Sequence, residues 1–218
     1  MDVTEWAGVF REGRQLYTRN AVPGRPVHEE ELRRADGVEY RAWDPFRSKL
    51  AAYLLHSAPA RLWDGSRSIL YLGGAHGTTV SHLAEARPEA TVYVVEKSPT
   101  AFAPLLRLSR ERTNIVPILA DAQLPERYAA DVGRVDFLYQ DVAQRQQAAI
   151  FIENARATLA PSGRGILMLK VRSVTQRQPS AAILRAARST LTAARLTVLH
   201  ESGLAPFSQE HVAIALRS

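Results

Sequence analysis

Apolar residues along the chain gather in short runs that alternate with longer stretches of helical periodicity. Five of the runs are nearly continuous in apolar and β-branched residues, and they predict strands at residues 68–74, 91–97, 114–121, 135–142 and 165–171. A continuous apolar run is typical of a parallel strand that helices cover on both faces. The other stretches predict helices at residues 47–57, 78–86, 98–112, 148–160 and 178–194. The alternation indicates an α/β fold built around a parallel sheet.

The two ends of the chain depart from this alternation. Residues 196–202 and 211–218 are apolar runs whose connection is too short for a helical crossover, so they predict an antiparallel hairpin. With the five parallel strands, the hairpin predicts a seven-stranded, mostly parallel sheet. Residues 1–40 mix glycine, proline and charges without a sustained period, and we interpret them as a small appendage that holds a short hairpin or a mobile arm. Residues 41–218 then form the main domain, whose first helix is predicted to start near Asp44-Pro45 because proline suits a first helical turn.

Composition narrows the chemistry that this fold can carry. The 218 residues suffice for one large domain or for one domain with a small appendage. No cysteine is present, which excludes disulfides, zinc-thiolate sites, iron-sulfur clusters and thiol catalysis together. The sequence has no apolar leader or long apolar run, so we expect a cytoplasmic protein that does not bind a membrane. The net charge of +6 favours a polyanionic partner such as nucleic acid.

Ligands of an open parallel sheet bind beyond the carboxyl ends of its strands, so the residues there are the candidate site. The first strand runs into the turn YLGGAHGTTV, where Gly73, Gly74 and Gly77 would let a ligand approach the backbone closely. The dinucleotide pattern G-x-G-x-x-G fails, because Ala75 and Thr78 stand where it requires glycine. No Gly-Lys-Ser/Thr follows, which also excludes a P-loop.

Charged residues end the other four parallel strands. Glu96 ends the second strand and Asp121 the third, where their carboxylates would hold ribose hydroxyls and an adenine amino group. A glycine turn and these two acids, without a phosphate-binding motif, predict an adenosine site of the kind that S-adenosylmethionine requires. Asp141 and Lys170 end the fourth and fifth strands, and we expect them to neutralise each other because an uncompensated buried charge is costly.

Lysine is rare in this sequence, and its placement is informative. Only three lysines are present, and two of them, Lys49 and Lys170, fall on elements of the candidate site. A lysine can give up its proton when it is crowded by another cation and partly desolvated, whereas an arginine keeps its proton. Their placement therefore favours proton transfer over an ion pair that only stabilises the edge of the sheet.

Six stretches of the sequence match a known family over about residues 40–216. They are YRAWDPFRSKLAA, YLGGAHGTTVSHLAE, NIVPILADA, VDFLYQDVAQRQQ, LMLKVRS and EHVAIAL. With them the chain resembles fibrillarin, the RNA 2′-O-methyltransferase of box C/D ribonucleoproteins. The resemblance implies a Rossmann-like class I methyltransferase fold with S-adenosyl-L-methionine as cofactor. It also implies three partners, namely an RNA substrate, a guide RNA and a scaffold protein.

The resemblance also assigns site residues. It implies a catalytic tetrad of Lys49, Asp141, Lys170 and His211, the last of which is predicted to begin the final strand. The residues that it implies for the cofactor site are Gly73, Gly74, Gly77, Thr78, Thr79, Glu96, Asp121, Ala122 and Gln144.

Four positions depart from the family pattern. The family has a small residue where this chain has His76, an aromatic at Lys97, an asparagine at Asp44 and a proline at Arg145. His76 and Lys97 are predicted to fall in the cofactor pocket. Arg145 and the unusual first forty residues indicate a changed partner surface.

Together these observations predict methyl transfer to a ribose 2′-hydroxyl of RNA. Lys170 would bind and deprotonate the hydroxyl, Asp141 would orient Lys170, Lys49 would favour proton release through like charge, and His211 would hold the ribose. Two alternatives stay open, a methyltransferase that acts on a small metabolite or peptide and a non-catalytic RNA-binding scaffold. A basic rim is expected to hold RNA phosphates, with Arg41, Arg47, Arg145 and Arg172 flanking the mouth of the site.

Overall fold

The larger sheet of the molecule has seven strands. The computed structural model describes residues 1–174 and 179–218, and the strand order is β11-β12-β10-β9-β6-β7-β8. Five adjacent strands are parallel, namely β8 (Ile115–Leu119), β7 (Thr91–Glu96), β6 (Ser68–Leu72), β9 (Val135–Gln140) and β10 (Leu159–Lys170). The strand β12 (Ser208–Arg217) pairs antiparallel with β10 and with β11 (Thr197–Leu204). The predicted α/β sheet with a C-terminal antiparallel hairpin is confirmed.

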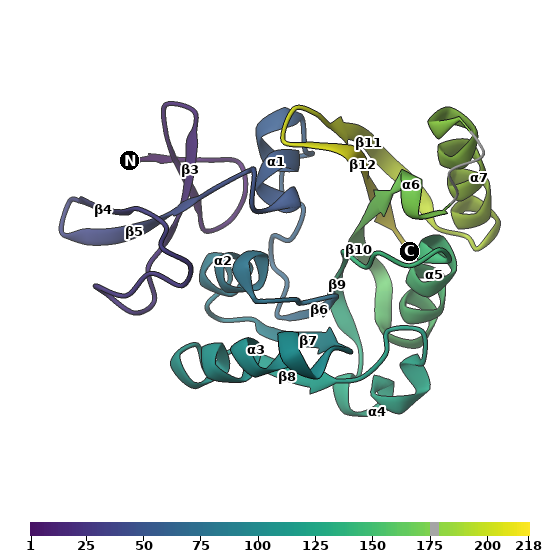
Figure 1. Ribbon diagram of the computed structural model, residues 1–218, viewed down its shortest axis with the longest axis horizontal. Coiled ribbons are helices and arrows are strands. Elements are labelled where there is room, and N and C mark those ends of the chain that lie inside the picture. The colour runs from purple at the N-terminus through teal and green to yellow at the C-terminus, as the bar shows by residue number, and fades with distance from the viewer. Residues whose placement is uncertain (175–178) are drawn as a thin grey trace.

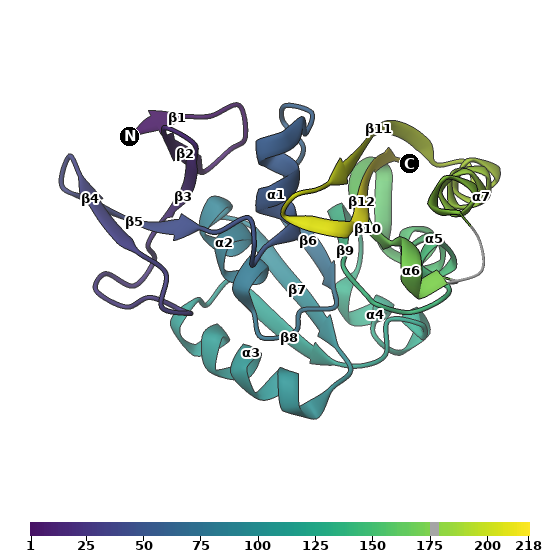
Figure 2. The same cartoon turned by 45° about the horizontal axis from the view of Figure 1, so that its top comes forward.

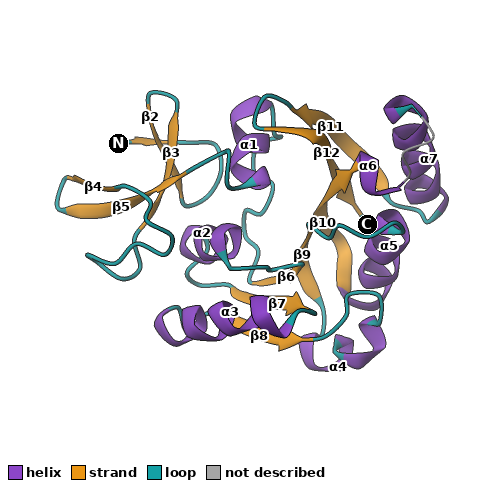
Figure 3. Ribbon diagram, viewed as in Figure 1, coloured by secondary structure: helices purple, strands orange, loops and turns teal. Residues whose placement is uncertain are grey.

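Helices cover both faces of this sheet (Figures 1 and 3). On one face lie α1 (Lys49–His56), α2 (Thr78–Ala86) and α3 (Pro99–Glu111). On the other lie α4 (Ala129–Val132), α5 (Gln147–Thr158) and α7 (Ser180–Ala193). Two short helices complete the domain, η1 (Pro125–Arg127) and α6 (Val171–Val174).

The strands are apolar throughout because alternate residues pack into two different cores. In β6, Ile69 and Tyr71 belong to the apolar cluster on one face, whereas Leu70 and Leu72 belong to the cluster on the other. Burial on both faces is the physical cause of the continuous apolar runs in the sequence.

Several boundaries differ from the predicted ones. The helix α1 begins at Lys49 and not near Asp44-Pro45, because the Ser48 hydroxyl caps it by accepting from the Ala51 N–H at 3.3 Å. The strand β12 begins at Ser208, so His211 lies inside the strand and not at its start. The strand β10 begins at Leu159, a position that apolar periodicity assigned to the preceding helix. Residue 178 of the predicted last helix lies outside the described residues.

The N-terminal residues form a second sheet (Figure 1, purple). Its strands are antiparallel in the order β1-β2-β3-β5-β4. They are β1 (Asp2–Val3), β2 (Val9–Glu12), β3 (Gln15–Arg19), β4 (Leu32–Ala35) and β5 (Val38–Trp43). Trp6, Leu16 and Trp43 pack in the same apolar cluster as residues of α1 and β6. The strand β5 crosses residue 40, and residues of both sheets belong to this one core. A division of the chain into two domains at residue 40 stays a prediction.

A buried ionic network joins the smaller sheet to α2. The carboxylate of Glu85 accepts from Arg41 Nε at 2.9 Å, from Arg112 Nη2 at 2.7 Å and from the Thr18 hydroxyl at 2.8 Å. The side chains of Glu85 and both arginines are at most 1% exposed. The expectation that Arg41 belongs to a basic rim is therefore wrong, because this arginine neutralises a buried acid. Such a charge is stable in the interior only while every partner is present.

Within residues 1–174 and 179–218, every helix is too short or too polar to cross a lipid bilayer.

Candidate active site

A cleft of about 230 Å³ opens where the parallel strands β6, β7, β8 and β9 end. Four of the residues expected to hold the cofactor line it, namely Gly73, Glu96, Ala122 and Gln144. Asp141, expected in catalysis, also lines the cleft. The parallel strands thus bring side chains that are far apart in sequence to one cavity at one edge of the sheet.

Acceptor groups in the cleft are held in fixed positions. Glu96 is 9% exposed, and its two oxygens accept from the Ala75 N–H at 2.9 Å and the Ser98 N–H at 2.8 Å. Asp121 lies beside the cleft, where its Oδ1 accepts from the Gln123 N–H at 3.0 Å. Each of these carboxylate oxygens retains acceptor capacity for a ligand donor.

Gln144 adds an acceptor that the protein leaves unused. Its Nε2 lies 3.5 Å from Asp121 Oδ1, while its Oε1 is buried without a hydrogen-bond partner among the described residues. A buried polar atom without a partner is costly unless a ligand or water satisfies it. Acid side chains and this orphaned oxygen suit a cationic ligand that carries hydroxyl and amino donors, so the cleft fits S-adenosylmethionine.

The glycines of the turn serve chain packing. Gly73 has φ +85°, and a Cβ there would lie 2.4 Å from the Asp141 carbonyl oxygen. Only glycine therefore allows the end of β6 to lie against the end of β9. A Cβ on Gly74 would lie 2.3 Å from Val94, and Gly77 precedes α2 with φ +88°. Gly74 and Gly77 shape the turn and are outside the lining of the cleft.

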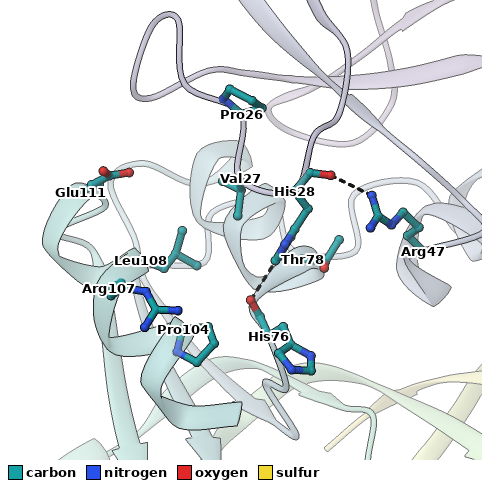
Figure 4. Close-up of a pocket in the computed structure, with 10 residues that line it drawn as sticks. All are labelled: Pro26, Val27, His28, Arg47, His76, Thr78, Pro104, Arg107, Leu108 and Glu111. Carbon is teal, nitrogen blue, oxygen red and sulfur yellow. Dashed lines mark hydrogen bonds between the residues drawn. The ribbon is translucent and has the colours of Figure 1, made fainter. Parts of the chain in front are cut away.

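A second cavity, of about 570 Å³, lies on the other side of this turn (Figure 4). Thr78 and His76 line it together with the loop before β4, and the His28 side chain donates through Nε2 to the His76 carbonyl at 3.1 Å. Thr79 is buried and donates to the Ser48 hydroxyl at 3.0 Å. The expectation that His76 falls in the cofactor pocket is wrong, because it is outside the lining of that cleft, whereas Lys97 does line it.

The four residues of the expected tetrad come from four elements that meet beside the cleft. Lys49 opens α1, and its Nζ lies 2.7 Å from Asp141 Oδ2. Asp141 follows β9 and is fixed by its own N–H, which donates to the Leu72 carbonyl at 2.9 Å. Lys170 ends β10 directly opposite His211 of β12.

The charge partner of Asp141 differs from the expected one. Asp141 pairs with Lys49 and not with Lys170, and no described acid lies within 4.0 Å of the Lys170 amine. The reason is that α1 directs its first side chain over the end of β9, which sequence order alone does not reveal. Within the described part of the chain, Lys170 thus has no ion pair at the edge of the site.

His211 is held as a neutral imidazole. Its Nδ1 lies 2.8 Å from the Ser208 hydroxyl. Burial, and then the positive charges of Lys49 and Lys170, lower the pKa of His211 to about 4. The register of β10 and β12 places His211 directly opposite Lys170.

The whole chain matches a known protein family. The family model described as Fibrillarin matches residues 2–218. The chain belongs to the fibrillarin family. A fibrillarin-like rRNA/tRNA 2′-O-methyltransferase of Methanosarcina barkeri is 40% identical over 209 residues, which are 94% of this chain and 92% of the relative.

Two solved structures of the fibrillarin family superpose closely on this chain. Aeropyrum pernix fibrillarin, in complex with natively bound S-adenosyl-L-methionine, has a TM-score of 0.89 at 38% identity and covers 99% of this chain and 96% of its own. A fibrillarin/Nop5p complex has a TM-score of 0.87 at 35% identity, with 99% of both chains covered. The Rossmann-like methyltransferase fold of the family is therefore the fold of this chain.

In this fibrillarin-family chain, the backbone of Lys170 is anchored by a residue that the sequence analysis missed. The side chain of Gln147 accepts from the Lys170 N–H at 2.8 Å and donates to the Lys170 carbonyl at 3.1 Å. Gln140 in turn donates to the Gln147 carbonyl at 2.8 Å, and both glutamines are at most 1% exposed. Gln147 thus replaces the strand neighbour that Lys170 lacks. The sequence signal that could have pointed to Gln147 is its position, as a polar residue directly before the apolar helical stretch 148–160.

The state of His211 gives a direct test of this geometry. We expect an NMR titration, with the resonance assigned by its loss in His211→Gln, to give a pKa of about 4. The pKa of His211 in the folded state lies below its ordinary value of 6.5. As the pH falls, the His211 ring is therefore protonated in the unfolded chain before it is protonated in the folded chain. The stability from burying the neutral ring is therefore present above pH 6.5 and declines as the pH falls towards 4. A measured pKa at or above 6.5 would show that His211 is not enclosed beside the two lysines.

Proposed function

We propose that this chain is an S-adenosylmethionine-dependent methyltransferase that methylates a ribose 2′-hydroxyl of RNA. The main support is the Lys49–Asp141 ion pair, which leaves Lys170 without an acid partner among the described residues. Lys170 also lies opposite His211, whose ring is neutral. An amine in this setting is suited to accept a proton from a hydroxyl. Membership of the fibrillarin family, whose relative in Methanosarcina barkeri is named an rRNA/tRNA 2′-O-methyltransferase, supports RNA as the acceptor.

The proposed cofactor roles follow the acceptors of the cleft. When bound, the cofactor supplies a methyl group on a sulfonium sulfur, which leaves as a neutral thioether. Glu96 would hold the ribose hydroxyls of the cofactor, Asp121 its adenine amino group, and Gln144 Oε1 would accept a further donor. Gly73 and Ala122 would form the adjacent walls. Gly74, Gly77, Thr78 and Thr79 would act through the shape of the turn and the start of α2.

The proposed chemistry moves one proton and one methyl group. With S-adenosylmethionine bound, the 2′-oxygen would take the methyl group from the sulfonium sulfur, and Lys170 Nζ would accept the proton of the hydroxyl. Gln147 would keep the end of β10 in place during this step, while Asp141 holds Lys49 near the acceptor. His211, neutral, would bind the ribose by hydrogen bonding.

Cofactor binding gives a quantitative prediction. We expect Asp121→Ala to weaken S-adenosylmethionine binding by about 1–3 kcal/mol, because a buried ligand donor loses its acceptor. Isothermal titration calorimetry measures the change. Asp131→Ala, at an exposed acid of α4, is the matched control and should leave the affinity unchanged. Equal affinity in both variants would remove Asp121 from the cofactor site.

The proposed partners are a substrate RNA, a guide RNA and a scaffold protein. The fibrillarin/Nop5p complex is the structural support for the scaffold. Arg47, Arg145 and Arg172 are exposed, and we propose that they contact RNA phosphates. We also propose that residues 1–40 act as an appendage to a catalytic domain of residues 41–218, and that the enzyme works in the cytoplasm, where its RNA substrate is accessible.

A labelled-methyl experiment tests the function. Purified protein and methyl-labelled S-adenosylmethionine are incubated with total RNA, with protein extract and with a small-molecule extract of the source cells, in the presence and absence of guide RNA and scaffold. We expect label in RNA, recovered after nuclease digestion as 2′-O-methyl nucleosides. Label only in peptide or metabolites would support the alternative acceptor, and absence of cofactor binding would support a non-catalytic scaffold.

A further inference from the structure

The hydroxyl of Ser48 joins the first turns of two helices that carry parts of the candidate site. It accepts from the Ala51 N–H at 3.3 Å, which caps α1, and from the Thr79 hydroxyl of α2 at 3.0 Å. Ser48 is 2% exposed and Thr79 is 8% exposed, so both bonds lie in the interior. Figure 2 shows α1 and α2 side by side on one face of the sheet. The start of α1 is therefore fixed to the start of α2.

The hydroxyl of Thr79 is used between helices and not within its own helix. A threonine or serine hydroxyl in a helix commonly bonds the backbone of that helix. The Ser81 hydroxyl of α2 does so, donating to the Thr78 carbonyl at 2.8 Å. Thr79 instead donates to α1, and it is outside the lining of the cofactor cleft. The direction of this hydroxyl thus favours a role towards α1 over a contact with the cofactor.

Lys49, which directly follows Ser48, stands at an unfavourable position for a lysine. It is the first residue of α1, where the helix dipole repels a cation, and the first turn Lys49–Ala52 contains no acidic residue. Its amine nevertheless lies 2.7 Å from Asp141 Oδ2. A long side chain keeps one such geometry only while its own backbone is held in place. The backbone of Lys49 is held by the bonds of its neighbour Ser48.

The rest of α1 is anchored in a different way, by apolar packing. The residues that follow Lys49 in the helix are buried, namely Leu50, Ala51, Ala52, Tyr53 and Leu54. Loss of the bond between Ser48 and Thr79 should therefore leave the helix folded. The effect should be confined to the first turn, which carries Lys49.

The bond between the helices also leads to the cofactor cleft. Thr79 lies shortly after the turn of residues 73–77, in which the Ala75 N–H donates to Glu96 Oε2 at 2.9 Å. Glu96 lines the cleft. The turn that borders the cleft and the lysine of α1 are thus connected through two buried hydroxyl groups.

We propose that Ser48 and Thr79 are positioning residues, which set Lys49 relative to the cofactor cleft without contacting the cofactor or the RNA. The proposal rests on the proposed function, in which Asp141 holds Lys49 near the acceptor. Asp141 fixes only the amine end of Lys49, and the two hydroxyls fix its backbone end. Misplacement of a group by about 1 Å can lower a reaction rate about 10²-fold, so one hydrogen bond far from the reacting atoms can have a large kinetic effect.

Thr79→Val is the most informative variant, because it removes the bond between the helices and leaves the Ala51 N–H capped by Ser48. In the complex of this chain with guide RNA and scaffold protein, we expect its single-turnover methylation rate to fall about 10- to 100-fold. The KM for RNA and the affinity for S-adenosylmethionine should stay within a few fold. Thr79→Ser keeps the hydroxyl and should restore most of the rate. Ser48→Ala removes both bonds and should be at least as slow as Thr79→Val.

The rarity of lysine gives a spectroscopic test that does not depend on catalysis. In protein labelled isotopically at lysine Cε, the three lysines give three NMR signals, and Lys49→Arg identifies the signal of Lys49 by its loss. The two ε-protons of Lys49 should differ in chemical shift, because the ion pair holds one rotamer. Thr79→Val should bring these two shifts together, while the signals of Lys97 and Lys170 stay in place.

Thr158→Val is the matched control. The Thr158 hydroxyl is also buried and donates to the Asn154 carbonyl at 2.7 Å, but it belongs to the last turn of α5. This variant should have a similar urea midpoint to Thr79→Val, with the methylation rate and the Lys49 signal of the wild type. Equal rates in the two variants would therefore overturn the proposal.

Three further outcomes are decisive. An unchanged Lys49 signal in Thr79→Val, or a loss of rate in Thr79→Ser as large as in Thr79→Val, would overturn the positioning role. A loss in Thr79→Val that appears mainly in cofactor affinity would assign Thr79 to the cofactor and would also overturn it. A wild-type complex that does not methylate RNA, with the expected change of the Lys49 signal in Thr79→Val, would support the positioning of Lys49 and overturn the proposed function.

Discussion

Lys170→Met is expected to lower the rate of methyl transfer by about 10²–10⁴-fold, the usual contribution of a positioned general base. Lys170 ends β10 opposite His211, and among described residues no acid lies within 4.0 Å of the Lys170 amine. The substitution removes this amine, which is the proposed proton acceptor. The methionine side chain keeps the length and the apolar stem, so S-adenosylmethionine affinity should stay within a few fold. Single-turnover methylation and calorimetry on the same variant separate the two quantities.

Lys170→Arg distinguishes proton transfer from electrostatics. Guanidinium keeps its proton at any physiological pH, so this variant retains the positive charge and loses the base. We expect it to fail nearly as badly as Lys170→Met. An active arginine variant would show that Lys170 contributes charge alone.

Glu85→Ala is expected to destabilise the protein by about 3–5 kcal/mol, the usual effect of removing one partner from a buried ionic network. Arg41 and Arg112 both bond this carboxylate and are fully enclosed, so the variant leaves two buried cations without an acid at that position. The loss should appear in urea denaturation as a lower midpoint with a similar slope. Because Thr18 of β3 bonds the same carboxylate, the contact between the smaller sheet and α2 should loosen first.

Glu153→Ala is the matched control. Its ion pair with Arg156, at 2.8 Å, is at the surface, with the side chains 55% and 62% exposed. Exposed pairs contribute about 0–1 kcal/mol, so this variant should be close to the wild type. Equal stabilities of Glu85→Ala and Glu153→Ala would contradict the buried network.

The larger sheet could be predicted because its cause is visible in the sequence. Strands β6, β7 and β9 are buried on both faces, and burial on both faces produces continuous apolar runs. The smaller sheet gives no such signal in the sequence. Its strand β4 (Leu32–Ala35) is short, and its residues are half-buried or exposed, so it has no continuous apolar run. Arg41 was assigned to the surface because Glu85, the acid that it shares with Arg112 in the core, lies 44 positions away in the sequence.

The candidate site was predictable in part for a related reason. Residues at the ends of parallel strands converge, so the order of strands and helices was enough to place Glu96 and Asp141 at one edge of the sheet. Which lysine pairs with Asp141 depends on the direction of α1, and no sequence period encodes that direction. The anchoring of Lys170 by Gln147 depends on the end of the β9–β10 ladder, where a side chain replaces a backbone partner.

The most direct test of the account is guided methylation of a defined ribose. Two substrate RNAs, identical except for a 2′-hydroxyl or a 2′-deoxy sugar at the target, are offered to the complex of this chain, guide RNA and scaffold, with methyl-labelled cofactor. We predict one methyl group on the 2′-oxygen of the guided nucleotide, none on the deoxy substrate, and a shift of the modified position when the guide is changed. Equal labelling of the two RNAs, or labelling at a fixed site by the protein alone, would contradict it.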